Sequence, residues 1–169
     1  MPMNTLRDLL IQQLNELYAA ERHHMMTVPR LVQATTDTRL ADMLRANADE
    51  CSTHLSRLDV VFGDLGVRAP GELSESNGMR GILRDCLELA NMARAEPHVR
   101  DAALVALAQH IEHDQIAGYG CARTWSQLLG HHSSASQLQR CLDDERRADR
   151  DLTRLAQALN KAAMAPMVV

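Results

Sequence analysis

Hydrophobic residues recur at steps of three and four along most of the chain, which is the period of an α-helix with one buried face. The pattern predicts four long helices and one shorter one, over about 4–33, 38–65, 79–95, 98–129 and 135–161. Each long helix would measure about 40–48 Å at 1.5 Å per residue. Since the alternating pattern of strands is missing, we expect an all-α protein.

The breaks between these stretches indicate how the helices connect. Thr35–Thr38 can form a tight turn after the first helix, and Ser133 or Ser134 is the expected N-cap of the last. Glycine, proline and serine are frequent over 66–81, which predicts a long connection in mid-chain. Two hairpins joined by one long crossover are typical of a ferritin-like four-helix bundle, here a single domain over 1–169 whose crossover carries the short fifth helix.

Acidic residues interrupt the hydrophobic stripe of every long helix. The interrupting residues, in chain order, are Glu21, Glu50 with His54, Glu112, and Glu145 with Asp149. A charge buried alone is costly in a low-dielectric interior, so these acids need cations, protons or hydrogen bonds as partners. The sequence therefore predicts a polar cluster at the centre of the bundle.

Metal ions are one way to neutralise such a cluster. Many carboxylates with few nitrogen ligands suit iron, with manganese as a second possibility, and bridging carboxylates can hold two ions about 3.5–4 Å apart. We therefore predict Glu21, Glu50, His54, Glu112, Glu145 and Asp149 as metal ligands. The alternative is a metal-free carboxylate cluster that shares protons and has raised pKa values.

Several polar residues near these positions are expected to have other roles. His24 is interpreted as a packed histidine beside the ligands, with ligation as the alternative because it follows Glu21 at the Glu-x-x-His spacing. Gln115 is interpreted as a packed core amide, with metal binding through its carbonyl oxygen as the alternative. His113 follows Glu112 directly and so points about 100° away, which favours a hydrogen bond. Tyr119 is close enough along its helix to orient a carboxylate, although an ordinary core tyrosine is the favoured interpretation.

Composition restricts the class of partner and compartment. The net charge is −4, the pI is about 6.0, and no cluster of Lys and Arg suggests nucleic acid or an anionic membrane as partner. No run of about 18 apolar residues and no secretion signal is visible, so we expect a cytoplasmic protein. The four cysteines form no Cys-x-x-Cys pair and are interpreted as reduced thiols.

Several segments together resemble the YciE/YciF-type stress-response proteins of the ferritin-like superfamily, which is related to rubrerythrin. They include Leu17–Glu21, Val99–Leu104, Ile111–His113, Ile116–Gly120 and Glu145–Asp149. The resemblance covers nearly the whole chain. It implies a small dimer-forming bundle with a dinuclear metal site, in bacterial proteins linked to stress.

The chain departs from the pattern of these families at identifiable positions. Asn47, His54 and Gln115 stand where the YciF pattern often has His, Gln and Glu, so one carboxylate of that pattern is missing. In the second and fourth long helices, the second predicted ligand lies four residues after the glutamate, as in Glu50 with His54 and Glu145 with Asp149. Ferritin-like proteins usually have the shorter spacing Glu-x-x-His.

Two functions follow as hypotheses. In the first, a di-iron oxidoreductase reacts with peroxide or dioxygen, with Glu50 and Glu145 bridging the ions and Glu21 and Glu112 as terminal ligands. In the second, the chain is a structural or interaction homodimer whose metal stabilises the bundle. Exposed apolar positions on the crossover helix, namely Leu83, Leu87 and Leu89, favour a homodimer unless that helix covers its own bundle.

Overall fold

The computed structural model describes residues 3–71, 76–92 and 94–164, which contain five α-helices and no strand. The helices are α1 (Leu6–Ala34), α2 (Thr38–Asp64), α3 (Asn77–Ala90), α4 (Pro97–Leu128) and α5 (His132–Met164). The all-α prediction is confirmed, and the short fifth helix lies in the crossover as expected.

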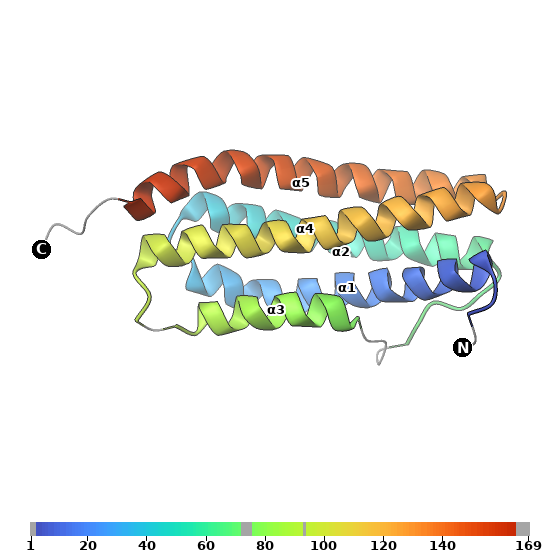
Figure 1. Ribbon diagram of the computed structural model, residues 1–169, viewed down its shortest axis with the longest axis horizontal. Helices are drawn as coiled ribbons and strands as arrows, with labels where there is room; N and C mark the ends of the chain where they lie inside the picture. The colour runs from blue at the N-terminus through green and yellow to red at the C-terminus, as the bar shows by residue number, and fades with distance from the viewer. Residues whose placement is uncertain (1–2, 72–75, 93, 165–169) are drawn as a thin grey trace, which may run out of the picture.

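The four long helices form a bundle of two antiparallel hairpins, α1–α2 and α4–α5 (Figure 1). α1 and α5 each pack against both α2 and α4, so α1 and α5 occupy opposite corners of the bundle. Because α3 carries the chain back along the bundle, α2 and α4 run in the same direction (Figure 1). This is the topology of a ferritin-like bundle.

Local capping residues set the helix ends, and five ends differ from the prediction by two residues or more, namely the start of α1 and both ends of α3 and α5. α3 ends at Ala90, well before the predicted residue 95, and Pro97 is the first residue of α4, a position where proline costs no helical hydrogen bond. The predicted N-cap of α5 at Ser133 or Ser134 is wrong, because α5 already begins at His132. Ser134 instead donates a hydrogen bond to Asp64 at 2.5 Å.

Two hydrophobic clusters fill the bundle, one toward each end. The first contains Val28, Leu31, Leu40, Leu44, Leu104, Val105, Ile111, Leu152 and Leu155. The second contains Leu10, Leu14, Leu17, Leu58, Phe62, Tyr119, Leu138 and Leu142. The predicted polar residues lie in a layer between the two clusters, so apolar side chains close off this layer from both ends of the bundle.

A buried carboxylate connects the two hairpins. Asp101 of α4 is 1% exposed and accepts hydrogen bonds of 2.6–3.1 Å from the turn between α1 and α2. The donors are the backbone N–H groups of Thr36 and Asp37 and the hydroxyls of Thr35 and Thr36. These bonds fix the register of the first hairpin against the second.

The crossover helix α3 covers the groove between α1 and α4. Leu83 is 4% exposed, and Leu87 and Leu89 are partly buried against the first hydrophobic cluster. The expectation that these leucines are exposed is therefore wrong, because the helix covers its own bundle.

α1 and α4 approach closely beside the polar layer. A Cβ atom on Gly118 would lie 2.8 Å from Cδ2 of Leu17, so the absence of a side chain permits this spacing. Gly118 directly precedes Tyr119, whose side chain points into the bundle and is fully buried. The close packing thus brings Tyr119 against α1.

All four cysteines are free thiols, and Cys121 is the exposed one. Within the described parts of the chain, no helix combines the length and the apolar character needed to cross a membrane.

Candidate metal centre

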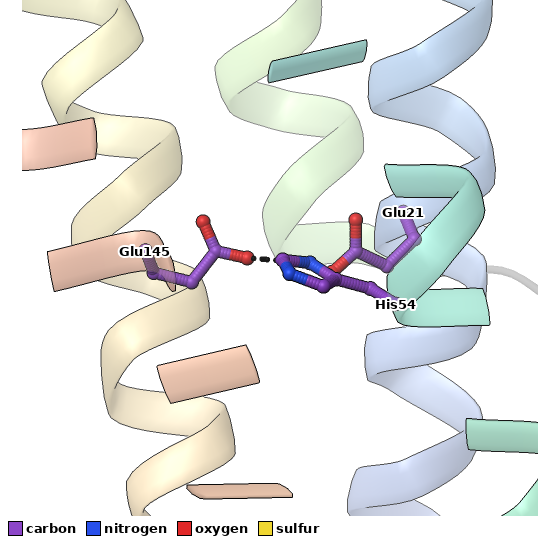
Figure 2. Close-up of side chains that lie close together, drawn as sticks. All are labelled: Glu21, His54 and Glu145. Carbon is purple, nitrogen blue, oxygen red and sulfur yellow. Dashed lines mark hydrogen bonds and ion pairs between the residues drawn. The ribbon is translucent and has the colours of Figure 1, made fainter. Parts of the chain in front are cut away.

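The centre of the polar layer is formed by three side chains from three helices, Glu21 of α1, His54 of α2 and Glu145 of α5 (Figure 2). Their residues are 0%, 1% and 5% exposed. Nδ1 of His54 lies 3.0 Å from Oε1 of Glu21 and 3.1 Å from Oε1 of Glu145. One potential ligand atom from each residue lies within 4.8 Å of the other two, which is close enough to surround one metal ion.

The charges of this group are set by burial and by mutual contact. Burial alone would lower the pKa of His54, but its bonds to Glu145 and Glu21 outweigh this effect and raise the pKa to about 12. Burial would raise the pKa of Glu21, yet His54 and Tyr119 lower it below its ordinary value. In the absence of metal, the layer therefore contains an imidazolium paired with a carboxylate.

A further acid, Glu112, competes with Glu145 for protons in the same layer. Burial, together with the neighbouring Glu145, raises the pKa of Glu112 well above its ordinary value. Burial also raises the pKa of Glu145, despite its contact with His54. Nδ2 of Asn47 donates to Oε1 of Glu112 at 2.7 Å. This proton-sharing arrangement is the metal-free alternative predicted from the sequence.

Several buried carboxylate oxygens lack hydrogen-bond partners within the described residues. They are Oε2 of Glu21, Oε2 of Glu112 and Oε1 of Glu145. The last oxygen is near His54 but outside the direction of a hydrogen bond. Buried oxygens without a partner reduce the stability of the fold. Carboxylate oxygens are also ligands that iron and manganese bind. The side chains present thus fit a metal ion.

Glu50 and Asp149, two of the three remaining predicted ligands, have their carboxylates paired with residues outside this group. The side chain of Glu50 is 34% exposed and pairs with Nη2 of Arg147 at 2.6 Å. Asp149 accepts a hydrogen bond from Gln109 at 3.1 Å and lies 3.3 Å from Nε2 of His113. The buried face of α5 continues from Glu145 through Ala148 and Leu152, which leaves Asp149 on the flank of the helix.

Tyr119 has a larger role than the favoured sequence interpretation gave it. Its hydroxyl donates to Oε1 of Glu21 at 2.5 Å, and its ring packs edge-on against His54 with ring centroids 5.7 Å apart. It therefore orients a carboxylate of the candidate centre.

Asp144 was missed in the sequence analysis. Its Oδ2 lies 2.6 Å from Nη1 of Arg57 and 3.4 Å from Nε2 of His54, and its Oδ1 lies 2.9 Å from Nη1 of Arg147. The spacing of Asp144 and Arg147, three residues apart on one helix, was the available signal.

His24 and Gln115 are buried beside the group. Nδ1 of His24 lies 3.6 Å from Sγ of Cys51, whereas Nε2 of His24 and both amide atoms of Gln115 have no partner in the described parts of the chain. Both residues line a small cavity together with Glu50, His54 and Glu145. The packed interpretation of His24 and Gln115 agrees with their burial, although their polar atoms are left unpaired.

Comparisons with known proteins identify close relatives. A family model described as a domain of unknown function, DUF892, matches residues 5–165. Protein YciF of Escherichia coli (strain K12) is 32% identical over 165 residues, which cover 92% of this chain and 93% of YciF.

Three solved structures are similar to this fold. The crystal structure of the E. coli stress protein YciF gives a TM-score of 0.88 at 29% identity, covering 94% of this chain and 99% of that one. YcfI from Rhodopseudomonas palustris, proposed to be a structural protein, gives 0.83 at 32% identity, with coverages of 89% and 94%. A protein from Xanthomonas campestris pv. campestris gives 0.72 at 14% identity, with coverages of 95% and 96%, a likeness of fold alone.

Proposed function

Because the chain belongs to the DUF892 family, as its resemblance to YciF-type stress proteins predicted, we propose that it is a ferritin-like metal-binding protein. Glu21, His54, Glu112 and Glu145 would hold iron, or alternatively manganese, in the polar layer. We further propose that the protein contributes to a bacterial stress response, as the description of the E. coli YciF structure suggests. The cytoplasmic location expected from the sequence is part of this proposal.

The observation that carries the proposal is the group of buried Glu21, His54 and Glu145, with buried Glu112 in the same layer. Each of these glutamates has one buried oxygen that accepts no hydrogen bond from the described residues. A group of this composition is costly to bury without a counter-ion, and imidazole with carboxylates is a ligand set for iron and manganese. A second ion, as the family resemblance implies, would require Glu50 to turn inward from Arg147.

The surrounding side chains prepare the centre in three ways. Tyr119 holds Glu21 in place through a hydrogen bond to Oε1, so that Oε2 is free to bind. The two hydrophobic clusters exclude water from both ends of the layer. Protons on His54 and Glu112 must leave when a cation binds, which makes binding weaker at low pH. A bound ferrous ion would supply one-electron chemistry toward peroxide or dioxygen.

Metal titration under anaerobic conditions tests the proposal. Wild-type protein should bind Fe²⁺ and Mn²⁺ stoichiometrically, measured by equilibrium dialysis and elemental analysis. A Glu21→Gln/Glu145→Gln double variant should lose this binding, whereas Glu88→Gln on the exposed surface of α3 should retain it. Equal binding by wild type and the double variant would show that the ions bind elsewhere.

Rapid mixing of the ferrous protein with hydrogen peroxide tests the oxidoreductase part. Oxidation should be faster than that of free iron at the same concentration and should be lost in the double variant. Rates equal to those of free iron would reject a redox role while leaving metal binding intact.

A structural role is the second candidate function, and a specific contact favours it. His54 already supplies a positive charge between Glu21 and Glu145, so the bundle has an internal counter-ion without metal. The relative YcfI is also proposed to be a structural protein. In that case, Glu50→Ala/Glu145→Ala should change the melting temperature without any redox phenotype.

A homodimer is part of either proposal and follows from the family resemblance. Exposed leucines on the crossover helix were expected to favour a homodimer. Leu83 is buried against the bundle, so this argument for a homodimer no longer applies. Light scattering coupled to size-exclusion chromatography should give twice the chain mass of 18.8 kDa; a mass of one chain would contradict the dimer.

A further inference from the structure

Glu50 is the predicted ligand that reaches solvent most readily. Its side chain is 34% exposed, compared with 6% for Glu145 and 0% for Glu21. Arg147 of α5 holds it with a 2.6 Å ion pair between Nη2 and Oε1. The pair lies where α2 and α5 face each other across the side of the bundle.

The structure has one cavity on each side of Glu50. The inner cavity, of about 10 Å³, has room for about one water molecule or ion and is lined by His54 and Glu145. The outer cavity, of about 390 Å³, opens to the surface and is lined by Arg147. Asn47 and Glu50 line both cavities and therefore form the partition between them.

Arg147 is also linked to the buried group through a second contact. Its Nη1 lies 2.9 Å from Oδ1 of Asp144, and Oδ2 of Asp144 lies 3.4 Å from Nε2 of His54. Arg147 thus bridges Glu50 and Asp144 and contacts the partition from the side of the outer cavity.

We propose that Arg147 is a latch on the entry route of metal ions, holding Glu50 outward until an incoming ion replaces the guanidinium as the partner of its carboxylate. Glu50 then turns inward with the ion and becomes a ligand. This inference rests on the proposed metal-binding function and adds the entry route and the residue that controls it.

The strength of the pair suits a latch rather than a permanent barrier. The side chain of Arg147 is 49% exposed and that of Glu50 is 34% exposed, so solvent screens the attraction between them. A divalent cation competes for the same oxygen with a higher charge than a guanidinium. We therefore expect the latch to slow entry by about 1.5- to 5-fold, which corresponds to the usual strength of exposed ion pairs.

Stopped-flow mixing of the metal-free protein with Co²⁺, followed by its visible absorption, measures the association rate directly. Arg147→Gln should accelerate association by about 1.5- to 5-fold. Arg146→Gln is the matched control, because Arg146 is the exposed neighbour and carries the same charge; its rate should equal that of wild type.

Two further variants separate a latch from a general effect of charge. Arg147→Lys keeps the positive charge but loses the guanidinium fork, so a latch predicts a rate nearer to that of Arg147→Gln, and a charge effect predicts the wild-type rate. In a Glu50→Gln background, the effect of Arg147→Gln should disappear, because the latch acts through Glu50.

The outcomes of these measurements distinguish a failure of the latch from a failure of metal binding. Equal association rates in wild type and Arg147→Gln, or an unchanged Arg147→Gln effect in the Glu50→Gln background, would overturn the latch while leaving metal binding in place. Absence of Co²⁺ binding in wild type and in every variant would overturn the proposed function and the latch with it.

Discussion

Tyr119 and Glu21, 98 residues apart in the chain, meet in a hydrogen bond of 2.5 Å between two side chains that are both 0% exposed. The same oxygen, Oε1 of Glu21, also accepts the bond from His54. Two donors therefore converge on one oxygen, while Oε2 of the same carboxylate has no partner in the described residues. This asymmetry leaves one side of Glu21 available for a cation.

Replacing Tyr119 by Phe removes the hydroxyl and should destabilise the metal-free protein by about 1.5–3 kcal/mol, the usual value of a hydrogen bond to a charged group. For a chain of this length, the melting temperature should fall by about 2–4 °C per kcal/mol. Thermal unfolding followed by circular dichroism measures the shift. Tyr18→Phe, at a partly exposed position, is the control and should change stability by less than about 1 kcal/mol.

Glu112→Gln should stabilise the metal-free protein and weaken metal binding. The pKa of Glu112 is raised in the folded state. Its contribution to the free energy of unfolding is therefore fully present below the unfolded pKa, about 4.3, and is lost as the pH rises through the folded pKa. Glutamine does not ionise, so the variant should gain about 1–3 kcal/mol over wild type at pH 8 and nothing near pH 4.

Urea denaturation at both pH values checks the Glu112 prediction, with Glu88→Gln on the exposed face of α3 as control. A gain of the same size at pH 4 and pH 8 would mean that packing, not ionisation, separates Glu112→Gln from wild type.

His54 should stabilise the metal-free protein less as the pH rises. Its pKa is raised to about 12, so its contribution is complete below the unfolded value of about 6.5 and declines above it. The decline is up to about 1.4 kcal/mol per pH unit. His54→Gln should therefore cost up to about 3 kcal/mol less at pH 9 than at pH 6.

The His54 prediction can be checked by chemical denaturation at the two pH values. His113→Gln, at a side chain that is 66% exposed, should differ by less than about 0.5 kcal/mol between them. A His54→Gln cost that is independent of pH would contradict the imidazolium assignment.

Asp101→Ala should destabilise the protein by about 3–5 kcal/mol, because it leaves the N–H groups of Thr36 and Asp37 without their acceptor. Asp101→Asn retains one oxygen and should cost less. Asp85→Ala, on the exposed face of α3, should cost less than about 0.5 kcal/mol. The free energy of unfolding in urea measures all three, and a loss below about 1 kcal/mol for Asp101→Ala would show that the turn does not depend on this carboxylate.

Helical periodicity predicted much of the fold and of the polar layer. Glu21, Glu112 and Glu145 lie on strong hydrophobic stripes, and each is buried as expected. Periodicity gives the face of a residue to within about one neighbouring position, since successive residues are 100° apart. Periodicity was therefore sufficient to predict the burial of residues at the middle of a hydrophobic stripe.

Residues at the edge of a stripe could not be placed in this way. Glu50 is adjacent to the buried Cys51, so a small rotation of α2 decides whether it points inward or toward α5. Arg147, from a distant part of the sequence, determines the outcome through its ion pair. The packing of α3 against its own bundle likewise depends on contacts between helices. The spacing of leucines along α3 does not predict those contacts.

The position of α3 makes the molecule one-sided. Its packing on α1 and α4 covers the first hydrophobic cluster, whereas α2 and α5 face each other with no further helix of the described chain laid across them. The flank between α2 and α5, which contains the Glu50–Arg147 ion pair, is therefore formed by two helices alone. A partner that binds over that flank would cover the outer cavity and Glu50, without contact with the buried Glu21 and His54.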